Sequence, residues 1–133
     1  MKSVIFITFT FISFFCKSQS EAEKQNVYTI VEEMPDFHGG QIEKNKFILE
    51  NLKFPESAIK NETYGKTYLK FTINKDGHIS DIVVIKGVPG CPECDEEAKR
   101  VLSIMPNWIP GKQGGKPVAT YYNQPINFQS KIK

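Results

Sequence analysis

The chain has 133 residues, which is enough for one well-filled domain and too few for two. With 40% hydrophobic and 24% charged residues, its composition is that of a globular protein rather than a disordered, fibrous or repetitive one. A formal charge of +2 gives no sign of a nucleic-acid-binding surface, and three cysteines are too few for a disulfide scaffold.

Residues 1–18 have the pattern of a secretory signal peptide. Lys2 precedes an apolar stretch without charge, and Cys16 and Ser18 occupy the small-residue positions before a cut after Ser18. A buried first helix and lipidation at Cys16 are the alternatives, although Phe14 and Phe15 stand where a lipobox has small residues. We expect export and a cleaved signal, with membrane association left open.

After the cut, residues 19–30 form a short polar leader that ends in a candidate edge strand, since residues 27–31 alternate with a β-branched bias. Residues 34–40 are rich in turn formers. Residues 41–52 show partial helical spacing, Pro55 ends that segment, and residues 56–61 predict a short further helix.

The centre of the chain predicts a β-hairpin. Residues 67–73 and 79–85 read as strands, and Asp76-Gly77 lies in the turn between them. Residues 95–105 then switch to helical spacing, and residues 118–128 offer a last strand that contains Pro125. Proline cannot donate to a ladder, so this strand suits an edge of the sheet.

This order of elements predicts an α+β fold with one sheet and helices on one of its faces. Trp108, which follows the helix, is expected to anchor the core beneath the sheet rather than to bind a ligand.

Five segments carry a resemblance to a known family. They are M-P-D-F-H-G-G at residues 34–40, F-P-E-S-A at 54–58, Y-G-K-T-Y-L-K-F-T-I-N-K-D-G-H-I-S-D at 64–81, C-D-E-E-A-K-R-V-L-S-I-M-P-N-W-I-P-G-K-Q at 94–113 and Q-P-I-N-F at 124–128. In their order and spacing, the chain resembles the C-terminal domain of the TonB energy-transducer family in its Bacteroidota form. The likeness covers residues 31–128, and the expected domain is 31–129.

The resemblance implies a small antiparallel sheet, made of the hairpin and the last strand, packed against two helices. It implies a periplasmic binding module with no catalysis and no cofactor, which adds the TonB box of an outer-membrane transporter to the edge of its last strand. The contact residues carried over are Val118, Thr120, Tyr121, Tyr122, Asn123 and Gln124. The bland alternative is that these side chains only build the sheet.

A transducer of this kind also implies an inner-membrane proton-channel complex as a partner. The leader spans only about 35 Å when fully extended, which is short of the distance between the two membranes, so direct force transmission is in doubt. A homodimer stays open, as does a non-transducing adaptor that binds another extended peptide.

Cys91 and Cys94 form a C-x-x-C pair ahead of the helix at residues 95–105. In an exported protein we expect a structural disulfide, and the alternatives are free or metal-bound thiols and a thiol–disulfide exchange protein. The acidic residues that follow Cys94 oppose thiolate formation. His38 and His78 lie in separate turns, so we expect no metal site.

The signal peptide can be tested directly. Mass spectrometry of the periplasmic fraction should find a mature chain that begins at Gln19, because the cut is expected after Ser18. A chain that keeps Met1 and stays in the cytoplasm would contradict export.

Overall fold

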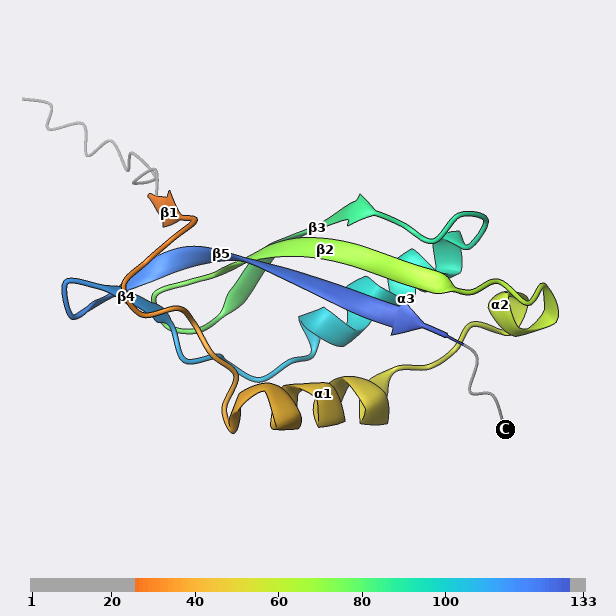
Figure 1. Cartoon of the computed structure of the whole chain (residues 1–133), viewed down its shortest axis with the longest axis horizontal. Coiled ribbons are helices and arrows are strands. Elements are labelled where there is room, and N and C mark those ends of the chain that lie inside the picture. The colour runs from red at the N-terminus through yellow and green to blue at the C-terminus, as the bar shows by residue number, and fades with distance from the viewer. Residues whose placement is uncertain (1–25, 130–133) are drawn as a thin grey trace, which may run out of the picture.

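The computed structural model describes residues 26–129, and it arranges them as a twisted sheet with helices α1 and α3 on the same side (Figure 1). The signal peptide, Cys16 and most of the leader lie outside the described residues. In chain order the elements are β1 (Val27–Tyr28), α1 (Gly40–Asn51), α2 (Glu56–Lys60), β2 (Gly65–Ile73), β3 (Ile79–Lys86), α3 (Pro92–Ser103), β4 (Gly111–Gln113) and β5 (Lys116–Phe128).

The strand order across the sheet is β1-β5-β2-β3. The predicted hairpin is confirmed as β2 and β3, and β5 returns antiparallel to β2 along the whole of that strand. The α+β prediction is therefore confirmed. β1 lies within residues 27–31, where the sequence offered a candidate edge strand, and it pairs parallel with β5. The structure adds β4, which forms a second hairpin with β5.

The turn between β2 and β3 requires a glycine at position 77 for two reasons. Gly77 has a φ of 85°, which side chains other than glycine rarely adopt. Its carbonyl accepts a hydrogen bond of 2.8 Å from the backbone N–H of Trp108, and a Cβ there would collide with the Trp108 carbonyl. The hairpin turn thus holds the segment that carries the core tryptophan.

Trp108 lies at the centre of the core, as expected, with 2% of its surface exposed. Its ring meets Phe37, Phe71 and Tyr122 at centroid distances of 5.5, 5.7 and 4.8 Å. These residues come from the segment before α1 and from strands β2 and β5. Edge-to-face packing of this kind stabilises the junction of the three segments.

Helix α3 begins earlier than the sequence pattern predicts. Cys91 precedes the helix and Pro92 opens it, a position at which proline loses no helical hydrogen bond. The first turn therefore contains Glu93 and Asp95, and the apolar face that follows is fully buried at Ala98, Val101 and Leu102. Acidic residues in the first turn favour the helix because its N-terminus carries partial positive charge.

An ion pair on α3 ties this helix to the link between α1 and α2. Arg100 donates to both carboxylate oxygens of Glu97, at 2.8 and 2.6 Å, and also to the Asn51 carbonyl at 2.7 Å. Glu97 in turn accepts from the Lys53 backbone N–H at 2.9 Å. The hydrogen bond from Arg100 is the main reason that the pKa of Glu97 lies below its ordinary value.

Because its pKa is lower in the folded state, Glu97 stabilises the fold above its unfolded pKa, and this contribution disappears as the pH falls through the folded value. The E97Q variant should lower the free energy of unfolding by about 1 kcal/mol at neutral pH and by progressively less in acid. Urea denaturation across this pH range measures the difference. The matched control is E96Q, since Glu96 is exposed and lies 3.6 Å from Lys99, and it should change little. A deficit of E97Q that persists unchanged in acid would contradict the assignment.

Candidate functional site

Strand β5 is the candidate site, and the structure shows which of its edges are occupied. On one side, residues 120–128 pair with β2. On the other side, β1 covers only Ala119 and Thr120. Within residues 26–129, no strand pairs with the remaining outer edge, which we call the open edge and define as residues 121–128 of β5.

The predicted contact residues at the start of the strand, Val118 and Thr120, already have pairing partners within the domain. Val118 already pairs with Gly111 of β4, and Thr120 pairs with both Tyr28 of β1 and Ile73 of β2. The sequence indicated a candidate edge strand at residues 27–31 but not its pairing with β5, and it gave no sign of β4, which has three residues. Thr120 is therefore paired on both sides and Val118 is paired with β4, so the longest stretch of β5 with one unpaired side is residues 121–128.

The orientation of the open edge follows from Pro125. This residue has no N–H, and its carbonyl accepts a 2.8 Å hydrogen bond from the side chain of Gln124 rather than completing a ladder bond with β2. In an antiparallel strand the N–H and C=O of a residue point to the same side and alternate along the chain. The backbone carbonyl of Pro125 thus faces the open edge, and so do the backbone N–H groups of Tyr121, Asn123 and Asn127.

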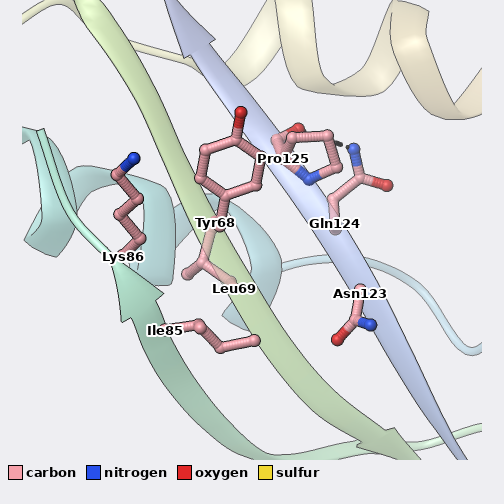
Figure 2. A pocket seen from close by; sticks show the side chains of 7 residues that line it. All are labelled: Tyr68, Leu69, Ile85, Lys86, Asn123, Gln124 and Pro125. Carbon is pink, nitrogen blue, oxygen red and sulfur yellow. Dashed lines mark hydrogen bonds between the residues drawn. The ribbon is translucent and has the colours of Figure 1, made fainter.

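Gln124 protects this edge with its side chain. Its amide nitrogen occupies the Pro125 carbonyl, and Figure 2 shows the amide on the side of β5 away from β2. Only 6% of the residue is exposed, yet its Oε1 has no hydrogen-bond partner. A buried acceptor without a partner is costly, and Gln124 Oε1 is such an acceptor next to the open edge.

Tyr121 and Tyr122 point to opposite faces of the sheet. The Tyr122 hydroxyl accepts a 3.0 Å hydrogen bond from Lys44 of α1, whose ammonium lies 5.1 Å from the Tyr122 ring. Lys44 is 4% exposed, and nothing in the sequence pattern of α1 indicates a buried lysine. The structure therefore places the Tyr122 side chain against the core. Tyr121 lies on the outer face, 4.0 Å beneath the Lys70 ammonium.

The outer face of the sheet, which the helices leave uncovered, carries two adjoining hollows. One has a volume of about 350 Å³ and lies over β2 between β3 and β5, and its lining residues are Tyr68, Leu69, Ile85, Lys86, Asn123, Gln124 and Pro125 (Figure 2). The other, of about 430 Å³, is lined by Thr29, Met34, Lys70, Ile85, Tyr121, Tyr122 and Asn123. Both hollows therefore reach the open edge through Asn123.

Cys91 and Cys94 form a disulfide at the start of α3, with sulfurs 1.97 Å apart. Only 1% and 0% of the two residues are exposed. Thiol–disulfide exchange requires a sulfur that another thiolate can reach, so this burial favours a structural role over a catalytic one.

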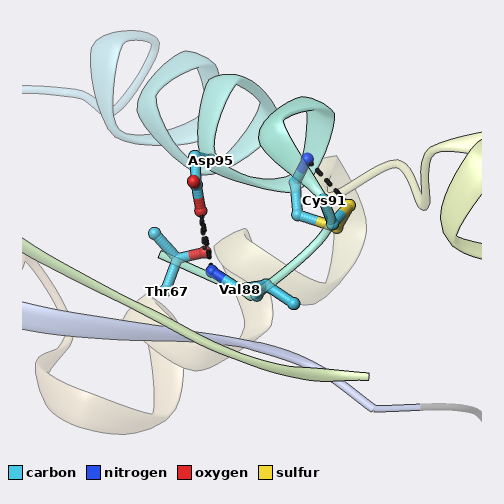
Figure 3. Close-up of a disulfide and its surroundings, with 5 residues drawn as sticks. Thr67, Val88, Cys91 and Asp95 are labelled. Carbon is cyan, nitrogen blue, oxygen red and sulfur yellow. Dashed lines mark hydrogen bonds between the residues drawn. A yellow bond between two sulfur atoms is a disulfide. The ribbon is translucent and has the colours of Figure 1, made fainter. Parts of the chain in front are cut away.

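Asp95 fixes the turn next to the disulfide (Figure 3). Its Oδ1 accepts hydrogen bonds from the Val88 backbone N–H at 3.1 Å and from the Thr67 hydroxyl at 3.0 Å. The disulfide loop is thereby held to β2 and to the end of β3.

Metal binding finds no support in the part of the chain that the structure describes. It contains no group of three or more histidine, cysteine or acidic side chains that could hold an ion. His38 and His78 are both exposed, in separate turns. In residues 26–129 there is also no helix with the length and apolar character needed to cross a membrane.

Comparison with known proteins identifies the family. Residues 50–130 match the model of the Gram-negative bacterial TonB protein C-terminal domain. No curated protein matched the chain. The solution structure of the Pseudomonas aeruginosa TonB C-terminal domain is similar, with 28% identity and a TM-score of 0.50, over 61% of this chain and 80% of that one. A Helicobacter pylori TonB C-terminal domain is 21% identical, with a TM-score of 0.49, over 69% of this chain and 81% of that one.

The chain therefore belongs to the TonB C-terminal domain family, as its motifs indicated. Domains of this family serve TonB-dependent transport and lie in the periplasm of Gram-negative bacteria.

Replacing both Cys91 and Cys94 with serine tests the role of the disulfide. The loop that it closes is very short, so its removal should lower the free energy of unfolding by only about 1–3 kcal/mol. The folded variant should bind peptides like the wild type, and the wild type should show no insulin-reduction activity. Such activity in the wild type, lost in the double variant, would instead support a thiol–disulfide protein.

Proposed function

We propose that this domain binds the extended TonB box of an outer-membrane transporter by adding it as a strand to the open edge of β5. The proposal rests on family membership together with one observation, the unpaired stretch of residues 121–128. Strand addition takes most of its affinity from backbone hydrogen bonds, and alternate side chains then add specificity. In this role the domain is a periplasmic binding module without catalysis or cofactor, and it serves energy-coupled transport.

Three features of the open edge support this role. The open edge belongs to a strand that is held firmly in the sheet, since β5 is paired with β2 throughout residues 120–128. Its outward N–H groups at Asn123 and Asn127 belong to exposed residues. The Gln124 amide occupies the Pro125 carbonyl, and when it leaves, an arriving strand gains that carbonyl as an acceptor.

An inner-membrane proton-channel complex completes the proposed role as the source of force. A non-transducing adaptor would use the same open edge for another extended peptide, and a homodimer would pair two such edges. Peptides from transporters of the same genome distinguish the first reading from the adaptor, and sedimentation of the free protein detects the homodimer.

The variant N123P tests the open edge. It removes an outward N–H without removing a donor that β2 uses, so the binding of a TonB-box peptide should weaken at least about tenfold. Isothermal titration measures the affinity, and circular dichroism checks that the variant is folded.

The matched control is N123A, which keeps the N–H and should bind nearly as well as the wild type, because backbone pairing carries the interaction. Asn127→Pro offers a second test at the other outward N–H, nearer the end of the strand. Equal binding by the wild type and both folded proline variants would rule out the open edge as the docking site.

A further inference from the structure

The outer face of the sheet carries several large apolar side chains that are exposed to solvent. Tyr68 of β2 is 42% exposed, and Val83 and Ile85 of β3 are 56% and 59% exposed. Met34, from the segment that follows β1, is 52% exposed. Single exposed apolar residues are ordinary, but a group of them around hollows marks an interaction surface.

The hollows concentrate this character at one place. Ile85 lines both of them, with Tyr68 in one and Met34 in the other, and their volumes of about 350 and 430 Å³ can accept bulky side chains. Val83 is as exposed as Ile85 but lines neither. The apolar surface is thus shaped around Ile85 rather than spread evenly along β3.

The charged side chains that line the hollows are all positive. Lys86 lines the first and Lys70 the second, and neither lining contains a carboxylate. The Lys70 ammonium lies 4.0 Å from the centre of the Tyr121 ring, which holds it over the outer face. Neither lysine has a carboxylate within 4.0 Å among residues 26–129, since the ion pairs found there join Lys99 to Glu96 and Arg100 to Glu97. An acidic group of a partner would therefore meet an uncompensated positive charge.

We propose that the two hollows bind an acidic segment with bulky apolar side chains that is continuous with the peptide paired at the open edge. Apolar side chains of that segment fill the space around Ile85, and its carboxylates pair with Lys70 and Lys86. This inference rests on the proposed function and adds a specificity that backbone pairing alone cannot provide, because backbone hydrogen bonds are the same for every sequence.

Continuity with the open edge is the reason for choosing a peptide over other occupants. Asn123 lines both hollows, and its N–H faces the open edge. A chain that pairs with β5 at Asn123 therefore lies next to the residue that borders both hollows, with β5 between it and the hollow over β2. A side chain on the outer face of the added strand lies beside Asn123 and Tyr121, within reach of the nearer hollow.

The test uses peptides from the N-terminal segments of transporters encoded in the same genome, each made in two forms. One form has the natural sequence, and the other has every Asp and Glu replaced by Asn and Gln. Affinities are measured by isothermal titration at two salt concentrations. The acidic form should bind wild type about tenfold more tightly than its neutral form, and this advantage should shrink in high salt.

Two pairs of variants locate the effect. I85S should weaken binding several-fold, whereas V83S, an equally exposed position on the same strand outside the hollows, should not. The K70Q/K86Q double variant should bind the acidic and neutral forms alike. K66Q is its control, since Lys66 is an exposed residue of β2 that lines neither hollow.

The outcomes separate this inference from the proposed function. If peptides bind and N123P abolishes binding, but I85S and K70Q/K86Q bind as wild type does, the open edge stands and the hollows are not part of the site. If no peptide binds the wild type, the proposed function fails and this inference fails with it. Self-association that I85S disrupts, or binding to anionic phospholipid vesicles that K70Q/K86Q abolishes, without peptide binding, would assign the hollows to another occupant and overturn the inference.

Discussion

The antiparallel pairing of β5 with β2 is the constraint on which the rest of the structure depends. It places Phe71 and Tyr122 side by side, so that Trp108 can pack against both. It also pairs one edge of β5 along residues 120–128 and leaves the opposite edge of this stretch to other parts of the chain. Since β1 covers only Ala119 and Thr120, the same pairing that builds the core creates the open edge. The core and the candidate site therefore depend on the same strand, because one edge of β5 pairs with β2 and the other is the open edge.

An unpaired edge invites association with any extended chain, and proteins usually protect such edges. Here single residues, rather than a whole strand, protect the edge. Pro125 removes one donor, and the Gln124 amide occupies the neighbouring carbonyl. Lys44 of α1 donates a hydrogen bond to the Tyr122 hydroxyl and so ties the start of this stretch to the helix. A strand guarded by a side chain rather than by another strand remains available to a peptide that can replace one hydrogen bond.

Several contacts tie helix α3 to the rest of the fold. The disulfide, Asp95 and the Glu97–Arg100 pair fix α3 to β2, to the end of β3 and to the link after α1. None of these groups lines the hollows of the outer face. The buried cysteines therefore belong to the scaffold, and the hollows lie on the opposite face of the sheet.

Much of the fold followed from local sequence signals. The Asp76-Gly77 turn between alternating strands predicted the hairpin because only a few residues accept the positive φ that such a turn requires. The spacing of Ala98, Val101 and Leu102 predicted the buried face of α3, and the motifs predicted the family. Pro125 was an early sign of the open edge, since proline cannot donate to a ladder.

Tertiary structure alone decided which part of that edge is open, and which residues belong to the site. The sequence offered residues 27–31 as an edge strand without naming its partner, and β4 is too short to give a periodic signal, yet β1 pairs with Thr120 and β4 with Val118. The burial of Lys44, the amide of Gln124 and the hollows that share Ile85 arise from segments far apart in the chain. Local propensity and periodicity report the conformation of one segment at a time. The side chains that meet, and the edge that stays unpaired, are set only when the strands find their order in the sheet.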